Sequence, residues 1–153
     1  MIRPATHDDL AELVGFCLEC HASMPWPDFG LTMDEDSLII GLLDFLESPA
    51  ADLSVVEIDG AIAGACAVAV GPYPLDRRLV VASEWMWHMR PSFPDGLTKR
   101  KWIVRMLDHM LGWARENGAK VFKANTVFLD IALTCALERR GIRPMETACI
   151  GRL

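Results

Sequence analysis

The chain has 153 residues, of which 52% are hydrophobic and 24% are charged, and its formal net charge is −6. A single globular domain over residues 1–153 is therefore expected, and a disordered chain is not. The acidic balance argues against binding to a nucleic-acid backbone, and the longest uncharged apolar run, residues 61–71, is too short to cross a membrane.

Hydrophobic periodicity and turn residues predict a series of strands and helices. In chain order they are a strand at 1–5, helices at 6–22 and 34–49, strands at 53–58 and 61–70, a loop at 71–78, a strand at 79–89, a helix at 98–117, a strand at 119–126, a helix at 128–140 and a terminal strand at 143–153. The order β-α-α-β-β-β-α-β-α-β predicts an α/β (α+β) domain with a mixed central sheet.

The bounds of these elements depend on a few local signals. Thr6 followed by Asp9 is a variant of the capping box that starts a helix. The pair Asp59 and Gly60 between two apolar runs is the strongest hairpin signal in the sequence. Gly118 is placed to end the long helix.

Residues Cys17, Cys20 and His21 have the C-x-x-C-H spacing by which haem is covalently attached. In the predicted helix 6–22 both cysteines fall on the apolar stripe that faces the core. Cytochromes can also carry this motif after an N-terminal helix, so the missing export signal and the many strands decide against haem. Structural zinc needs four ligands, and no second Cys/His pair has suitable spacing, so no metal is predicted.

The other cysteines do not indicate a disulfide framework. The total of five is odd, and Cys66, Cys135 and Cys149 lie in apolar stretches, as small hydrophobic side chains do. The acidic pair Asp8 and Asp9 stands where a secretory signal would have its apolar segment. A cytoplasmic protein is therefore expected.

Several stretches of the sequence resemble parts of the GNAT acyltransferase superfamily, in particular its small phage and bacterial members. They are MIRPATHDDLAEL for the opening strand and capped helix, VVEIDGAIAGACAV for the central hairpin, EWMWHMRP followed by MLDHMLGWARENGAK for the fourth strand and cofactor-binding helix, and ALERRGIRP for the closing helix and turn. The likeness covers nearly the whole chain. It implies a GNAT fold with about six to seven strands, in which the fourth and fifth strands splay apart.

The resemblance also implies acetyl-CoA as co-substrate. Its arm would lie between the splayed strands and bond to the backbone of Trp87 and Met89, while its pyrophosphate would meet the loop that opens the long helix. The family loop reads R/Q-x-x-G-x-G/A, whereas residues 91–102 keep only Gly96 and lack the leading arginine. The further residues expected at the cofactor are Leu97, Thr98, Lys99, Arg100 and Asn125.

Glu84 matches a position where many family members place the carboxylate that deprotonates the amine, and a strand-edge carboxylate is the alternative. Strict alternation would put it on the same face as Met86 and His88, unless a bulge in the strand intervenes. His88 is then a second candidate base, although a histidine satisfied within the sheet is the alternative. Where family members commonly have a tyrosine that protonates the departing thiolate, this chain has Leu137.

Trp26 and Phe29 stand in the loop where family members shape the acceptor pocket, with ordinary loop packing as the alternative. The expected activity is acetyl transfer from acetyl-CoA to a primary amine of a small molecule or protein, by direct attack. The alternative is a GNAT-shaped binding or regulatory protein without turnover, as the altered loop and the missing tyrosine suggest. The five tryptophans and eight methionines would suit a homodimer interface.

Overall fold

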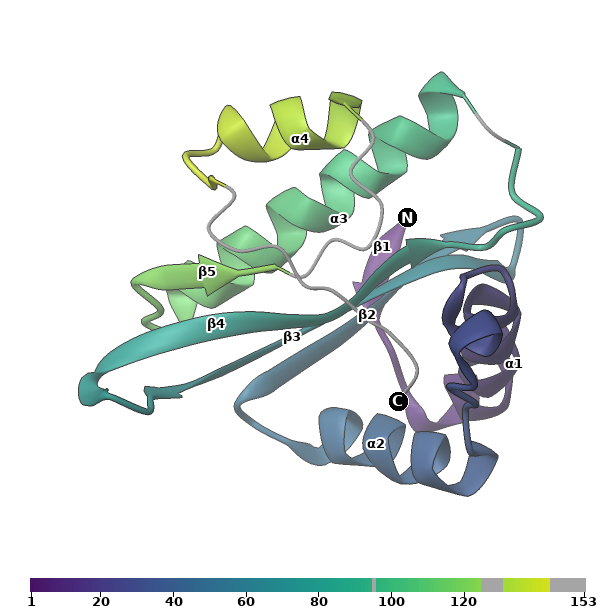
Figure 1. Ribbon diagram of the computed structural model, residues 1–153, viewed down its shortest axis with the longest axis horizontal. Coiled ribbons are helices and arrows are strands. Elements are labelled where there is room, and N and C mark those ends of the chain that lie inside the picture. Colours follow the sequence, from purple (N-terminus) through teal and green to yellow (C-terminus); the bar gives the residue numbers. More distant parts are fainter. Residues whose placement is uncertain (95, 125–130, 144–153) are drawn as a thin grey trace.

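The computed structural model describes residues 1–94, 96–124 and 131–143 (Figure 1). Its elements are β1 (Ile2–Pro4), η1 (His7–Asp9), α1 (Leu10–Ala22), η2 (Trp26–Phe29), α2 (Glu35–Glu47), β2 (Ala51–Ile58), β3 (Ala61–Tyr73), β4 (Asp76–Met89), α3 (Leu97–Glu116), β5 (Val121–Lys123) and α4 (Ile131–Glu138), where η marks short 3-10 helices. The predicted order is confirmed as far as these residues reach. The terminal strand expected at 143–153 lies almost wholly outside them.

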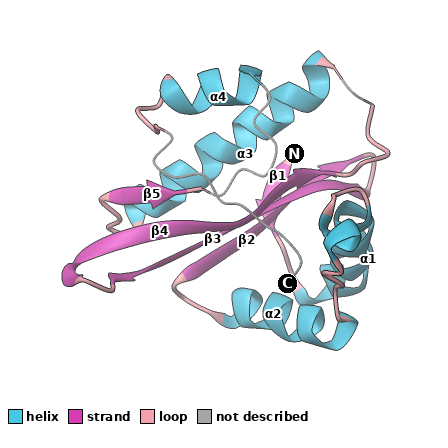
Figure 2. Ribbon diagram, viewed as in Figure 1, coloured by secondary structure: helices cyan, strands magenta, loops and turns pink. Residues whose placement is uncertain are grey.

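The strands of the described residues form one sheet in the order β1-β2-β3-β4-β5. Neighbouring strands are antiparallel except β4 and β5, which are parallel. Helices α1 and α2 cover one face of the sheet, and α3 and α4 cover the other (Figures 1 and 2). This arrangement confirms the predicted α/β class. Within the described ranges, no helix is both long enough and apolar enough to cross a membrane.

Each face of the sheet has its own hydrophobic core. Successive side chains of a strand point to opposite faces, so the central strands contribute alternate residues to the two cores. The core under α1 and α2 contains Leu13, Phe16, Leu42, Val55, Ala65 and Ala67. The core under α3 contains Val56, Cys66, Val68, Met106, Leu107 and Met110. Strand β4 contributes to both cores as well, with Met86 in the first and Trp87 and Met89 in the second. The two faces of the sheet are therefore separate apolar environments.

Cys17 and Cys20 lie on the buried side of α1, with 8% and 5% of their surface exposed. This confirms the core-facing stripe predicted for helix 6–22. Burial raises the pKa of Cys17 to about 11 and that of Cys20 to about 12. Both thiols are therefore protonated at neutral pH and are poor nucleophiles.

The loop predicted at 71–78 is wrong, because the β3–β4 ladder continues almost to the turn. Strand β3 runs to Tyr73 and β4 starts at Asp76, which leaves only Pro74 and Leu75 between them. Most side chains of this ribbon are exposed, and Leu75 is 85% exposed. A two-stranded ribbon without a buried face has no apolar alternation to reveal it, and its prolines and charged residues read as a loop.

Strands β3 and β4 approach closely at Gly64. A Cβ atom there would lie 2.9 Å from the backbone oxygen of His88 and 2.5 Å from Sδ of Met89. The thioether can move, but the carbonyl moves only with β4. Gly64→Ala should therefore lower the free energy of unfolding by about 1–3 kcal/mol in urea titrations. Gly71→Ala on the same strand is the control, because nothing lies within 4 Å of its Cβ position, and equal losses would contradict the argument.

A polar cluster joins α3 to β2. Nε2 of His109 lies 2.9 Å from Oδ2 of Asp52 and 3.0 Å from Oγ of Ser54. These are the residue types of a hydrolase triad, but a triad uses the two different ring nitrogens, and here both contacts fall on Nε2. Ser54 is also fully buried. The cluster is therefore a structural link between helix and sheet.

The hydrogen bond with Asp52 raises the pKa of His109 above 6.5, against the opposing effect of burial. The folded state then holds this proton more tightly than the unfolded state. The stabilisation is complete below the ordinary pKa and is lost as the pH rises through the raised one. We expect the free energy of unfolding to fall from about pH 6 to about pH 8, and to fall less in His109→Gln. Urea titrations at both pH values measure this, and equal decreases would contradict it.

Candidate functional site

A β-bulge in β4 decides which of its side chains share a face. Met86 lies opposite Ala67 and Glu84 lies opposite Val68, so Trp85 is an extra residue between two consecutive partners on β3. Alternation is interrupted there. The side chains after Trp85 therefore lie on the other face from the one that strict alternation predicts.

Glu84 and His88 consequently lie on opposite faces of the sheet. Glu84 shares the face of its cross-strand partner Val68, which belongs to the core under α3, and it is buried with 9% exposure. His88 lies opposite Ala65, which belongs to the core under α1 and α2. The bulge that the sequence analysis left open as the exception to strict alternation is therefore present, and the two candidate bases are not brought together.

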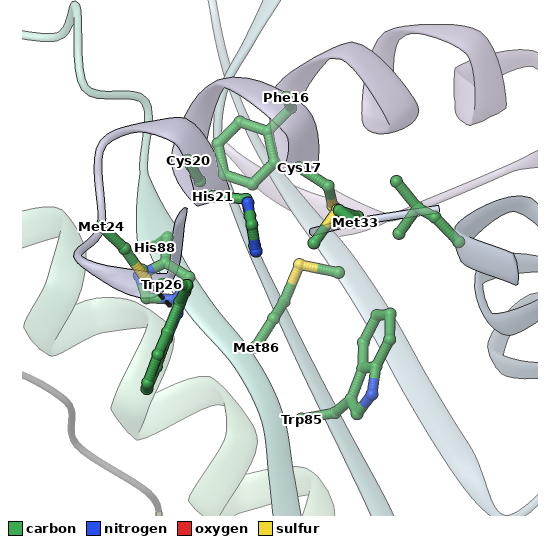
Figure 3. A pocket seen from close by; sticks show the side chains of 11 residues that line it. Phe16, Cys17, Cys20, His21, Met24, Trp26, Met33, Trp85, Met86 and His88 are labelled. Carbon is green, nitrogen blue, oxygen red and sulfur yellow. Dashed lines mark hydrogen bonds between the residues drawn. The ribbon is translucent and has the colours of Figure 1, made fainter. Parts of the chain in front are cut away.

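A pocket of about 270 Å³ opens on the side of β4 that faces α1 and α2 (Figure 3). It is lined by Phe16, Cys17, Cys20, His21, Met24, Trp26, Met33, Leu38, Trp85, Met86 and His88. The bulge brings both Trp85 and Met86 to this side. Trp85 is held there by α2, because its ring stacks on Phe45 with centroids 4.8 Å apart. Figure 3 shows the His21 ring pointing toward Met86.

Trp26, for which the family resemblance implied a place at an acceptor pocket and ordinary loop packing was the alternative, stands in the wall of this pocket. Its indole N–H donates to Sδ of Met24 over 3.1 Å, which fixes the ring within the turn η2. Phe29 belongs to the same turn, and its side chain lies outside the described part of the chain.

Most of the lining residues were not predicted at the site, where only Trp26 and His88 had been expected. His21 and the two cysteines of α1 were considered only for haem, although the helical period that places the cysteines at the sheet also brings His21 near it. Strict alternation assigns Trp85 to the opposite face, and the sequence does not show at which residue of β4 a bulge would interrupt the alternation.

His88 is the polar group that β4 contributes to the pocket. Burial lowers its pKa, so the imidazole is neutral near pH 7 and can accept a proton. The thiols of Cys17 and Cys20 remain protonated at that pH. The pocket therefore contains a neutral base and no thiolate from these two residues.

Strand β4 extends beyond its parallel neighbour. The ladder between β4 and β5 ends at the pair Ser83 and Lys123 in the described residues, whereas β4 continues to Met89. The bulge and the three pocket residues that β4 contributes, Trp85, Met86 and His88, all lie in this continuation. The fourth and fifth strands are the two that the family resemblance implied would splay apart.

The peptide groups of this continuation alternate between its two edges. The N–H of Arg90 donates to the oxygen of Ala63 on β3 over 2.8 Å. Antiparallel alternation then directs the peptide groups of His88 toward β3 and those of Trp87 and Met89 toward the opposite edge. These two residues are the ones expected to meet an extended thioester arm.

The N-terminus of α3 lies next along the chain. Gly96 precedes the helix with φ of 117°, a backbone conformation that favours glycine, and its oxygen accepts the first helical bond from the N–H of Arg100. The N–H groups before that bond have no acceptor within the helix. The first turn consists of Leu97, Thr98, Lys99 and Arg100, none of which is acidic. Asn125, also expected at the cofactor, lies outside the described residues.

Two side chains hold the continuation of β4 between the helices. Nε1 of Trp87 donates to the oxygen of Ile103 on α3 over 2.9 Å. Arg90 donates to Glu19 of α1 over 2.6 Å and to the oxygen of Ile62 over 3.0 Å. The pocket on one face and the α3 terminus on the other are therefore positioned by the same short strand.

No family model matches the chain, and no curated protein matches it. Solved structures do. A GNAT family acetyltransferase of Staphylococcus aureus has a TM-score of 0.65 at 14% identity, covering 100% of this chain and 98% of that one. A ribosomal-protein-alanine N-acetyltransferase of Brucella melitensis has a TM-score of 0.64 at 13% identity, covering 100% and 99%. A transcriptional regulator of Bacillus halodurans has a TM-score of 0.73 at 17% identity, covering 100% and 99%.

Identities this low establish the fold alone. The chain has the fold of the GNAT acetyltransferases, as the sequence resemblance implied.

Proposed function

We propose that this protein is an acetyl-CoA-dependent N-acyltransferase that moves an acetyl group to a primary amine by direct attack. The observation that carries the proposal is the continuation of β4. One edge of this segment offers the peptide groups of Trp87 and Met89, and one face offers a pocket that contains His88. Acetyl-CoA bound along the edge of β4 and an amine bound in the pocket would therefore meet at the same strand.

The residues of the described chain fit acetyl-CoA. An extended arm can bond to the edge of β4 as an added strand does. A pyrophosphate suits the first turn of α3, where the helix dipole and the positive charges of Lys99, Arg100 and Lys101 act together. The cofactor supplies the acetyl group as a thioester, and the products are an amide and the free thiol of CoA.

The chain's own groups support direct attack. His88 takes the proton that the amine must lose, because it is neutral and lies in the pocket. The two cysteines there have raised pKa values, which disfavours an acetylated thiol on the enzyme. Leu137, at the family tyrosine position, has no proton to donate, and water is the donor that we propose for the departing thiolate.

A second candidate is a binding or regulatory protein of this fold without turnover. It is favoured by the segment 91–102, which keeps only Gly96 of the family loop, and by Leu137. The same fold occurs in a chain described as a transcriptional regulator.

Calorimetric titration with acetyl-CoA, followed by mass spectrometry of amines incubated with protein and acetyl-CoA, tests the proposal. Binding at a ligand concentration of about 100 Kd should stabilise the fold by about 2.7 kcal/mol. Binding together with acetylated product supports the transferase. Binding without product from any amine supports the second candidate, and no binding at millimolar acetyl-CoA overturns the proposal.

A further inference from the structure

The pocket beside β4 has apolar walls, and these walls restrict the number of charges that its ligand can carry. None of the described residues that line it is an Asp, Glu, Lys or Arg. Its walls are aromatic rings, thioethers, thiols, one leucine and two histidines. A ligand with several charges would lose its hydration there without gaining a charged partner, which is unfavourable. A carbon body is the part of a ligand that these walls can accommodate.

The size of the pocket points the same way. Its volume of about 270 Å³ lies just below the usual range of ligand pockets, which is roughly 300–1,000 Å³. Phe16 contributes a fully buried ring, and Trp26 and Trp85 contribute two more walls. Aromatic walls gain most from flat or branched hydrocarbon groups that fill the space between them.

Apart from thiols and indoles, the polar side chains that the described residues bring to the pocket are His21 from α1 and His88 from β4. The imidazole of His88 offers a neutral nitrogen beside the peptide edge that would hold the acetyl donor. A single amine at one end of a ligand can reach this nitrogen while the rest of the ligand stays among the apolar walls. A second amine would have to lie against those walls.

We propose that this pocket selects small monoamines with an apolar body, aromatic or branched aliphatic, and excludes polyamines and other polycations. The inference rests on the proposed function, because it identifies the pocket as the acceptor site. It adds the class of acceptor, which neither the fold nor the resemblance specifies.

The NMR signals of the histidine side chains can show where an amine binds, without any measurement of enzyme activity. The chain has four, of which His21 and His88 line the pocket, His7 lies on exposed η1 near Glu47, and His109 lies on α3 against β2. Imidazole NMR signals recorded during titration with 2-phenylethylamine or 3-methylbutylamine should shift for His21 and His88 and stay fixed for His7 and His109. Spermidine should bind at least about tenfold more weakly.

Two results overturn the inference. One is that spermidine perturbs His21 and His88 as strongly as the apolar amines do, or at lower concentration. The other is that neither apolar amine shifts these two signals at millimolar concentration. Both readouts use the unmodified protein, so they do not depend on how a variant folds.

A pair of tryptophan variants adds a steric test. Met24→Trp places a larger side chain in the pocket wall, whereas Leu31→Trp places it nearby at a residue that is 45% exposed and does not line the pocket. The apolar amines should lose about tenfold or more in affinity to the first variant and none to the second. Equal affinities for both variants would contradict the site.

The same samples separate this inference from the proposed function. Acetyl-CoA is titrated in parallel with the amines. If acetyl-CoA binds and the apolar amines do not, the acceptor class is wrong while the transferase proposal survives. If the amines shift His21 and His88 and acetyl-CoA does not bind, the pocket is correctly described and the transferase proposal fails.

Discussion

His88→Asn should lower kcat/KM for acetyl transfer by about 10²–10⁴-fold, the range expected when a general base is removed. His88 is neutral near pH 7 because burial lowers its pKa, and it lines the pocket proposed for the amine. Steady-state kinetics with an accepted amine measures the loss. Because the pKa is lowered, kcat/KM of the unmodified enzyme, calculated for the unprotonated amine, should stay high down to pH 6.5 and fall only at lower pH, where the imidazole gains its proton.

Glu84→Gln is the matched comparison for this prediction. Glu84 is the carboxylate that the family resemblance assigns to the amine, but it lies on the α3 face of the sheet, away from the pocket. Its replacement should therefore reduce kcat/KM much less than that of His88. If Glu84→Gln abolishes turnover while His88→Asn leaves it intact, the base is Glu84 and the assignment from the structure is wrong. Unchanged affinity for acetyl-CoA in both variants is the control for folding.

Thr98→Glu should weaken acetyl-CoA binding by about tenfold, or about 1.4 kcal/mol, and at the same time stabilise the fold slightly. Thr98 lies in the exposed first turn of α3, which contains no acidic residue. A carboxylate there interacts favourably with the helix dipole, worth about 0.3–1 kcal/mol. The same carboxylate repels a pyrophosphate at that end of the helix.

The opposite signs make this prediction specific. A variant that merely disturbed the fold would lose both stability and affinity. Thr98→Gln serves as the control, since the glutamine side chain has nearly the shape of glutamate but no charge. It should change neither the affinity for acetyl-CoA nor the free energy of unfolding by much. Calorimetric affinity and urea unfolding are measured on all three proteins. An unchanged affinity in Thr98→Glu would show that the pyrophosphate does not bind at the start of α3.

The arrangement of elements could be predicted from the sequence because its signals are local. The Asp59 and Gly60 turn, with Asp59 at φ of 52° and Gly60 at 79°, joins β2 and β3 as expected. The capping residues Thr6 and Asp9 start the first helical segment, where the backbone N–H of Thr6 donates to the Asp9 carboxylate over 2.8 Å. Such signals act within a few residues, so no tertiary information is needed to read them.

The interpretation of the C-x-x-C-H motif depended on the helical pattern of the residues around it. Helical spacing alone placed Cys17 and Cys20 at the core, and both are buried there. That His21 would join them at a pocket required the positions of β4 and of the turn η2, which are distant in sequence. The hydrophobic periodicity of a segment predicts which of its residues are buried, but not which distant segment they contact.

What the sequence by itself determined is the order of strands and helices as far as the described residues reach, the mixed sheet and the place of Trp26 in the loop after the first helix. What only the tertiary structure decided is the division of Glu84 and His88 between the two faces. That division follows from one extra residue, Trp85, in the pairing of β4 with β3. A bulge depends on how two strands align, and its energy comes from contacts across the sheet, here including the stacking of Trp85 on Phe45 of α2.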